Sequence, residues 1–306
     1  MPSFIVRRLL QGAVVIFGVT TVVFFVTRVA GDPVRVMAPL DATPAELDAL
    51  RAQLGFDRPM ITQYLDFLGG GLRLDFGESL RESRPALDVV LDALPRTLVL
   101  VVIGLVLAIV VSLPLGALAA LRPDSVLDRV LTVIGLVGLS APQFWMGLML
   151  IIVFGVGLGW FPTSGIGGVS HVVLPAVTLA MPAAGRLTML VRSSMLEQLN
   201  SQYVKALRTN GADEWRVVAV HAGRNAALPV VTLAGWELIL AISGATVLLE
   251  SVFAWPGIGF TLLRGIERQD LFVVQAAVLV IATLVVVVNT AIDIGYSWLD
   301  PRVKVS

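Results

Sequence analysis

The sequence has no cysteine, only two histidines and little charge. Of its 306 residues, 14% are charged and 7% aromatic, and the formal net charge is zero. The absence of cysteine excludes disulfides, thiol catalysis and cysteine-ligated metals or clusters. A neutral balance lacks the basic footprint of a nucleic-acid-binding protein. Because about a quarter of the residues of a soluble domain are charged, the shortage of charge argues against a soluble protein.

What the sequence has in excess is long apolar runs. Hydrophobic residues make up 57% of the chain, and the mean hydropathy is +0.88. Each run is near or above the roughly 20 residues that a helix needs to cross a bilayer, whereas soluble helices are apolar along one stripe only. We therefore predict an all-α integral membrane protein with six transmembrane helices, at roughly Leu9–Val29, Leu98–Leu121, Val130–Gly157, Val172–Leu190, Val230–Phe253 and Phe272–Ile292.

These runs divide the chain into three parts. Residues 1–30 form an N-terminal tail and the first transmembrane helix, which is too long for a signal peptide. Residues 31–95 form an extracytoplasmic helical insertion between the first and second helices. Residues 96–306 form a five-helix transmembrane core whose fourth and fifth helices are joined by a charged cytoplasmic loop, 192–228.

Basic residues predict the orientation, because short cytoplasmic loops are enriched in Lys and Arg. With the N-terminus inside, the two short outer loops carry only Arg264 and Arg268. An even number of spans then places the C-terminus in the cytoplasm as well. The inner segments carry eleven basic residues: Arg7, Arg8, Arg122, Arg129, Arg192, Lys205, Arg208, Arg216, Arg224, Arg302 and Lys304.

The insertion 31–95 has the pattern of short helices. Thr43–Glu46 has the residue types of a capping box, with proline at the first helical position. Gly55 supplies a left-handed stop for that helix. Pro59 opens a second helix, which we expect to close at Gly69–Gly71, and Pro85 opens a third.

The insertion is acidic, with eleven Asp and Glu against six Arg. Two interpretations remain open for it. It is either a solvated cap over helix ends or a docking surface for an external partner. For the second interpretation the candidate docking residues are Thr43, Glu46, Asp48 and Arg51.

The inner loop 192–228 carries five basic and three acidic residues and no run long enough to span. Gly211 should end a first, amphipathic helix, and Asp213 and Glu214 favour the start of a second. The loop is either a compact knob that contacts a soluble protein or a hairpin lying on the membrane surface. The first helix is indicated by apolar residues at helical spacing, namely Leu196, Leu199, Tyr203 and Leu207.

Polar and helix-breaking residues inside the spans are the candidates for a translocation pathway. Glu237 lies about 12 Å into the fifth span by the helical rise. It therefore faces the pathway or a partner subunit, or it is a core residue that holds the fifth and sixth spans together. We expect Arg186 to snorkel to the interface. Pro142 breaks the third helix and Pro182, with Pro175, the fourth, so freed carbonyls there need new partners.

No catalytic constellation is present. The two histidines are predicted on opposite sides of the membrane, and there is neither a metalloprotease helix nor a phosphate-binding glycine loop with lysine. We predict no catalytic, metal or cofactor site in this chain. Any ATP that drives it must be hydrolysed by another polypeptide.

Two segments of the inner loop carry a family resemblance. Tyr203–Gly211 and His221–Pro229 resemble the EAA loop of type I ABC-importer permeases, in the dipeptide/oligopeptide/nickel branch. Lys205 stands where the general motif has Glu, and Leu207 where it has Ala. Further pieces resemble that family in order and spacing: Arg7–Leu10, Gly31–Pro33, Leu54–Pro59, Asp75–Ser79, Pro142–Trp145, Gly159–Gly165, Arg192–Met195, Glu250–Gly259, Gln269–Asp270 and Asp300–Arg302.

The resemblance implies a type I ABC-importer permease fold and a subunit that is not itself an enzyme. Such a subunit forms half of the pathway for di- or oligopeptides or a related small solute, in the bacterial cytoplasmic (inner) membrane. Its partners would be a second homologous permease (a heterodimer), two cytoplasmic subunits that bind ATP and Mg, and an extracytoplasmic substrate-binding protein. ATPase coupling would fall to Lys205, Ala206, Leu207, Arg208, Thr209, Asn210, Gly211, Ala212 and Asp213.

A secondary transporter or channel that does not depend on ATP is the alternative. Such proteins commonly contain paired interrupted segments in matching halves of the chain. No such pair is evident in this sequence, so we favour the importer subunit.

Overall fold

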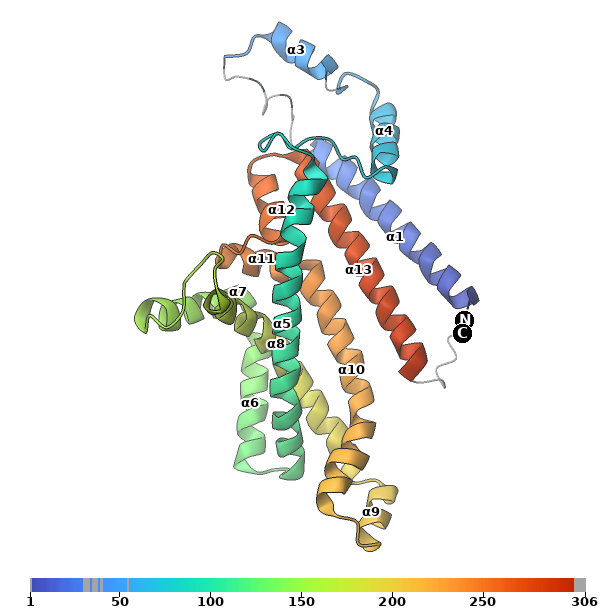
Figure 1. The fold of residues 1–306 in the computed structure, drawn as a ribbon, viewed down its shortest axis with the longest axis vertical. Helices are drawn as coiled ribbons and strands as arrows, with labels where there is room; N and C mark the ends of the chain where they lie inside the picture. Colours follow the sequence, from blue (N-terminus) through green and yellow to red (C-terminus); the bar gives the residue numbers. More distant parts are fainter. Residues whose placement is uncertain (1, 30–33, 35–37, 39–40, 54, 300–306) are drawn as a thin grey trace. The chain divides into compact units, whose positions relative to one another are not determined.

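A computed structural model describes residues 2–29, 34, 38, 41–53 and 55–299. These residues are helical apart from loops and one isolated bridge between Glu78 and Pro85. The helices are α1 (Pro2–Val29), α3 (Pro44–Gln53), α4 (Met60–Leu72), α5 (Ala86–Leu121), α6 (Val126–Ser140), α7 (Gln143–Leu150), η1 (Ile151–Gly157), α8 (Val169–Leu199), α9 (Gln202–Thr209), η2 (Arg216–Ala222), α10 (Gly223–Leu240), η3 (Ala241–Ala245), α11 (Thr246–Val252), α12 (Ile258–Glu267) and α13 (Leu271–Leu299), with η marking π-helices (Figure 1).

Five of the described helices are long and apolar enough to cross a membrane, and six spans result if one bent pair counts as a span. That pair is the third predicted helix. It is two helices, α6 and α7–η1, bent by 107°. The break was expected at Pro142, and it follows from the preference of a residue before proline for extended backbone. Ala141 has that conformation, with φ −79° and ψ 134°.

The prediction that proline breaks the fourth helix is wrong. Helix α8 continues through both Pro175 and Pro182. In an apolar bundle a freed carbonyl cannot turn to water, so the helix persists where neighbouring side chains or local adjustment satisfy it.

The described residues form two compact units, one of the residues up to Thr97 with Pro256–Thr290, and one of Leu98–Trp255 with Ala291–Leu299. In the second unit, α8 packs on both α6 and α10. The core there is rich in alanine, which allows close helix approach where lipid gives no hydrophobic drive. It includes Ala108 of α5, Ala180 and Ala183 of α8, and Ala226 and Ala234 of α10.

Glycine brings α6 and α8 into backbone contact. A Cβ added to Gly185 would lie 2.9 Å from the carbonyl oxygen of Gly135. Because backbone cannot move aside as a flexible side chain does, only glycine fits at Gly185 without a shift of one helix. The two helices therefore pack at their small residues over this stretch.

In the first unit, α1 and α13 run side by side (Figure 1), close enough that a Cβ on Gly12 would clash with Val286. The start of α5 and the start of α13 share an apolar core with Ile258 of α12. Buried Ser79 donates a 2.6 Å hydrogen bond to Asp270, which ties the segment before α5 to the loop before α13.

The insertion partly follows the prediction. The capping box at Thr43 is present, with its amide donating to the Glu46 carboxylate over 2.7 Å. Gly55 has the expected positive φ of 71°. Helix α4 includes the predicted glycine stop and ends at Leu72, directly after it. The prediction of a third short helix separate from the second span is wrong, because Ala86–Leu121 is one 36-residue helix.

Candidate functional site

Four polar or helix-distorting residues of the spans line one small cavity. A cavity of about 50 Å³ is lined by Gln143 at the start of α7, by Pro182 and Arg186 of α8, and by Glu237 of α10. Pro182 and Arg186 are four residues apart, so they share a face of α8. Two predicted pathway residues, Glu237 and Pro182, therefore meet, and the third, Pro142, directly precedes Gln143 and caps α7.

The Pro182 ring leaves one backbone carbonyl of α8 without its usual amide donor. In an α-helix the partner four residues earlier is Thr178. Gln143 donates its side-chain amide to that Thr178 oxygen at 3.4 Å. The prediction that a freed carbonyl needs a partner is thus confirmed here, and the partner comes from the helix after the bend at Pro142.

Arg186 and Glu237 form a bidentate ion pair across α8 and α10. Both guanidinium contacts are present, one of them 2.6 Å from Nη2 to Oε2. The Glu237 side chain is 4% exposed and that of Arg186 is 36% exposed. The expectation that Arg186 snorkels to the interface is wrong, because a charge in an apolar bundle is stabilised more by a buried countercharge than by extension toward water.

The pair also corrects the alternative interpretation of Glu237. That interpretation linked the fifth span to the sixth, whereas the observed partner belongs to the fourth. Sequence reasoning missed Arg186 and Gln143 as cavity residues. The available signal for Arg186 was a second charge in a neighbouring apolar run.

The inner loop forms an elbow, defined here as residues 202–214. Helix α9 ends at Thr209 with Asn210 as its cap, and Gly211 has the predicted positive φ of 76°. The amide of Ala212 then donates to the Leu207 carbonyl over 3.0 Å. The predicted helix through Leu196–Leu207 is wrong in one respect, because it breaks at Asn200 and Ser201, residue types that favour caps over helix interiors.

An exposed ion pair closes the elbow. Arg208 donates to Glu214 through Nε at 3.1 Å and Nη2 at 2.6 Å. Hydrogen bonding by Arg208 lowers the pKa of the Glu214 carboxyl, and the same bonds raise the pKa of Arg208. Nearby, Asn225 of α10 donates to the Tyr203 hydroxyl at 3.0 Å, which ties α9 to the following helix.

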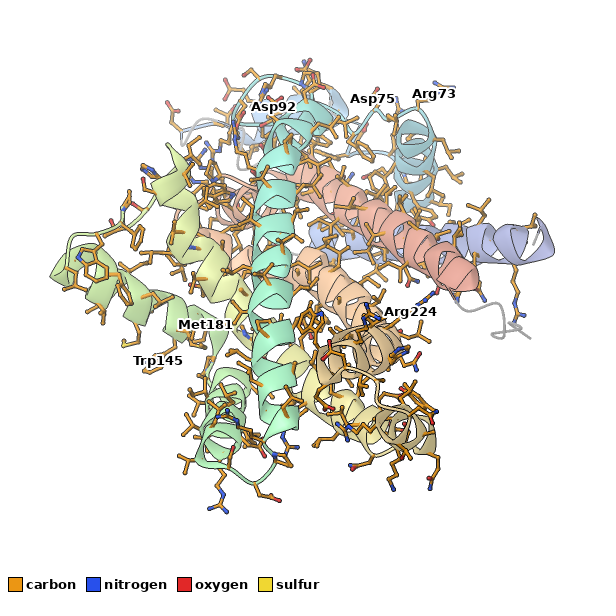
Figure 2. The ribbon with its side chains drawn as sticks, turned by 60° about the horizontal axis from the view of Figure 1, so that its bottom comes forward. Arg73, Asp75, Asp92, Trp145, Met181 and Arg224 are labelled. Atoms are coloured by element: carbon orange, nitrogen blue, oxygen red, sulfur yellow. The ribbon has the colours of Figure 1, made fainter. Side chains whose placement is uncertain are left out.

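The elbow presents polar side chains to solvent while anchoring itself by one buried residue. Val204 is fully buried, and Leu207 and Ala212 are half-buried. Trp215, directly after the elbow, is 71% exposed. Such exposure is unusual because an aromatic side chain gains most free energy when its large apolar surface is buried. Arg224, labelled in Figure 2, lies in the first turn of α10. The remaining predicted coupling residues are exposed, namely Lys205, Ala206, Arg208, Thr209, Asn210, Gly211 and Asp213.

The second short helix of the loop is not separate. From Arg216 the chain runs as one 37-residue helical stretch to Val252, through η2, α10, η3 and α11. The elbow therefore leads directly into the helix that carries Glu237.

The predicted docking residues lie on α3 or directly before it, and they bond to one another in two pairs. Thr43 and Glu46 cap the helix, and the hydrogen bond from the Thr43 backbone, followed by that from its side chain, lowers the pKa of Glu46. Asp48 and Arg51 pair at 3.2 Å. In the described part of the chain, no group of three His, Asp or Glu is arranged to hold a metal ion.

The fold and these sites define a polytopic helical membrane protein with a charged pair in its spans and an exposed elbow between two of them. Residues 112–305 match the model of the binding-protein-dependent transport system inner membrane component, and residues 1–101 match the N-terminal model of such components. The chain belongs to this family of transport-system membrane components. It is a non-catalytic permease subunit of an ABC transporter, a multi-pass inner-membrane protein that functions with ATPase and binding-protein partners.

Individual relatives resemble the chain over its full length. It is 36% identical to the oligopeptide transport system permease protein AppB of Bacillus subtilis (strain 168), over 99% of this chain and all of that one. A putative peptide permease protein of Brucella suis biovar 1 is 38% identical over the whole of both chains. The dipeptide transport system permease protein DppB of Escherichia coli (strain K12) is 35% identical over 99% of each.

Proposed function

We propose that this chain forms half of the translocation pathway of an ATP-driven importer of di- or oligopeptides. The observation that carries the proposal is the full-length likeness to relatives named as oligopeptide, peptide and dipeptide permeases. The proposed complex contains a second homologous permease, two cytoplasmic subunits that bind ATP and Mg, and an extracytoplasmic peptide-binding protein.

The test is transport by the reconstituted complex. The cognate binding protein is purified with whatever ligand it retains, and that ligand is identified by mass spectrometry. Peptide uptake into vesicles should require ATP, the binding protein and both permeases. Accumulation that needs an ion gradient but no ATP would identify a secondary transporter instead, and a retained nickel chelate or haem would move the substrate class away from peptides.

Within this function, the cavity that holds the Arg186–Glu237 pair is proposed as part of the pathway. Two opposite charges, a side-chain amide from Gln143 and the ring of Pro182 lie together there. Polar groups at membrane depth commonly mark substrate routes. In a state in which Arg186 and Glu237 separate, the two charges could bind the opposite ends of a zwitterionic peptide.

The elbow is proposed as the contact with the ATPase subunits. Its exposed polar side chains and the exposed Trp215 support this role. Cysteines at Asn210 and Ala212 should crosslink to those subunits, whereas a control cysteine at Asp124, also exposed, should not. The orientation with both termini in the cytoplasm belongs to this proposal, so labelling of Asn210→Cys by an impermeant reagent from outside would refute it.

Helix α3 is proposed as a docking element for the binding protein. The acidic balance of residues 31–95 would make docking sensitive to ionic strength, since exposed charges are screened over about 8 Å at physiological salt. Deletion of Thr43–Gly55 should abolish stimulation of ATP hydrolysis by loaded binding protein while the complex still assembles. Full stimulation in the deletion would exclude α3 as the docking element.

A further inference from the structure

Five arginines line one pocket in the first compact unit. The pocket has a volume of about 250 Å³ and is lined by Arg81, Arg84, Arg96, Arg264 and Arg268. Arg81 and Arg84 precede α5, and Arg96 lies in it. The other two lie in α12 or directly after it, so residues far apart in the sequence meet here. This concentration is notable because residues 31–95 are acidic as a whole, with eleven acids against six Arg.

All three carboxylates that line the pocket are engaged. Glu82 and Asp92 both pair with Arg84, at 3.0 and 2.7 Å. Asp270 accepts the buried Ser79 hydroxyl at 2.6 Å. Three lining carboxylates against five arginines leave the pocket positively charged.

Three of the arginines have no carboxylate partner within the described residues. Arg81 and Arg268 make no side-chain ion pair there, and Arg264 lies over the Phe260 ring with its guanidinium carbon 4.7 Å from the centroid. All three are exposed. A guanidinium matches phosphate oxygens in a bidentate geometry, so such a cluster selects a phosphate-bearing anion over a cation or a neutral solute.

The pocket lies at the ends of two candidate spans. Its apolar floor is formed by Val89 and Ala93 in the first turns of α5 and by Val273 in the first turn of α13. Both helices are membrane spans by length and composition. Two exposed apolar side chains lie close in sequence to lining residues, Leu91 at 43% and Ile266 at 53% exposed. A charged cluster joined to apolar surface at a span end is the environment of a lipid headgroup and its acyl chains.

We propose that this arginine pocket binds the phosphate headgroup of an anionic phospholipid at the membrane surface. The phosphodiester would contact Arg81, Arg264 and Arg268, while the acyl chains lie along the apolar surface of the spans. The inference does not depend on which solute the transporter carries.

The test uses the full chain in nanodiscs and two double variants. Arg264→Gln with Arg268→Gln removes two charges from the pocket. The control, Arg73→Gln with Arg122→Gln, removes two charges from exposed positions that do not line it. Figure 2 labels Asp92, beside the pocket on α5, and the control position Arg73 after α4. Equal melting temperatures in phosphatidylcholine establish that both variants are folded.

Retention of phosphatidylglycerol is then measured by native mass spectrometry, against phosphatidylcholine. The pocket variant should bind phosphatidylglycerol about tenfold more weakly or worse, because each Arg near an anionic surface adds substantially to lipid affinity. The control should bind as the unaltered chain does, and millimolar inorganic phosphate should not displace the lipid.

Four results would overturn the proposal. Equal losses in both variants would mean general charge attraction, and unchanged retention in the pocket variant would mean that the lipid lies elsewhere. Displacement by inorganic phosphate would identify a site for free phosphate. Unchanged lipid retention with loss of stimulation by the binding protein would assign the arginines to acidic groups of that protein.

Discussion

Arg186 of α8 and Glu237 of α10 hold each other in a bidentate pair, and both line the cavity that Gln143 and Pro182 also line. The pair joins two helices that also pack closely along their lengths. It therefore stabilises one arrangement of the fourth and fifth spans, and any state in which these helices separate must break it or hand its charges to another group.

Removal of one charge from this pair should destabilise the chain. Glu237→Gln leaves the guanidinium without its countercharge, at a cost of about 3 kcal/mol, the lower end for buried pairs because Arg186 is 36% exposed. The double variant Arg186→Gln with Glu237→Gln restores neutrality and should recover much of that loss. Thermal unfolding of the four forms in detergent gives the coupling energy, and additive effects would contradict the prediction.

The same four forms distinguish a pathway role from a structural one. If the pair lines the pathway, the double variant regains stability but not peptide uptake. If the pair only fastens the helices, uptake returns with stability. ATPase activity of the assembled complex is the control, because it should stay near normal in the double variant under both roles.

The elbow should loosen in acid. Bonding to Arg208 lowers the pKa of Glu214 below its usual value of about 4.3. A carboxyl with a lowered folded-state pKa contributes stability above the unfolded pKa, and this contribution is lost as pH falls through the folded value. Spin labels at Lys205 and Ala219, both exposed, should give one narrow distance distribution from pH 6 to 8 and a broader one below about pH 4.

Glu214→Gln should broaden that distribution at every pH, and the matched control Asp213→Asn should not. Asp213 is also exposed, and within the described residues its side chain makes no hydrogen bond or ion pair. An unchanged, narrow distribution at low pH in the unaltered chain would show that Arg208–Glu214 does not set the shape of the elbow.

Loss of the capping box should weaken docking by melting α3. Thr43→Ala removes the hydroxyl that donates to the Glu46 carboxylate and accepts from the Glu46 amide. Loss of these bonds should destabilise the helix by about 1 kcal/mol. Hydrogen exchange should then be faster across α3 and unchanged in α4. Stimulation by the binding protein should need several-fold more of that protein. Asp41→Ala, just before the box, serves as the control.

Gly185→Ala should destabilise the second unit more than Gly135→Ala. The added methyl at Gly185 meets a backbone oxygen at 2.9 Å, whereas at Gly135 it meets the flexible end of Met189 at 3.2 Å. Overpacking of this kind costs about 1–3 kcal/mol. Gly18→Ala, with no atom within 4 Å, should be neutral or stabilising in the same unfolding assay.

Local chemistry made several features predictable from the sequence. The Thr43–Glu46 cap, the positive φ at Gly55 and Gly211 and the break at Pro142 each depend on residues adjacent in the chain. Such features need no knowledge of tertiary structure, because side-chain caps and proline or glycine backbone preferences act within one turn.

Features that depend on partners far along the chain were not predictable. Arg186 and Glu237 are 51 residues apart, and nothing in either run identifies the other as its partner. The continuity of α8 through Pro182 likewise depends on Gln143, which approaches only because the chain bends at Pro142. The arginine pocket draws on two stretches far apart in the sequence, 79–96 and 256–273, and is visible only in the folded unit.

The unbroken helical stretch from Arg216 to Val252 has a mechanical consequence. Glu237 lies about 32 Å from Arg216 along it, at 1.5 Å per residue. An α-helix resists compression over such a length. A displacement of the elbow would therefore tilt or rotate this helix as a whole rather than shorten it. The π-helices η2 and η3 lie directly before and after α10. Ala241 and Ala245 of η3 line the cavity itself. Any tilt of this helix would therefore act on the cavity that holds the Arg186–Glu237 pair.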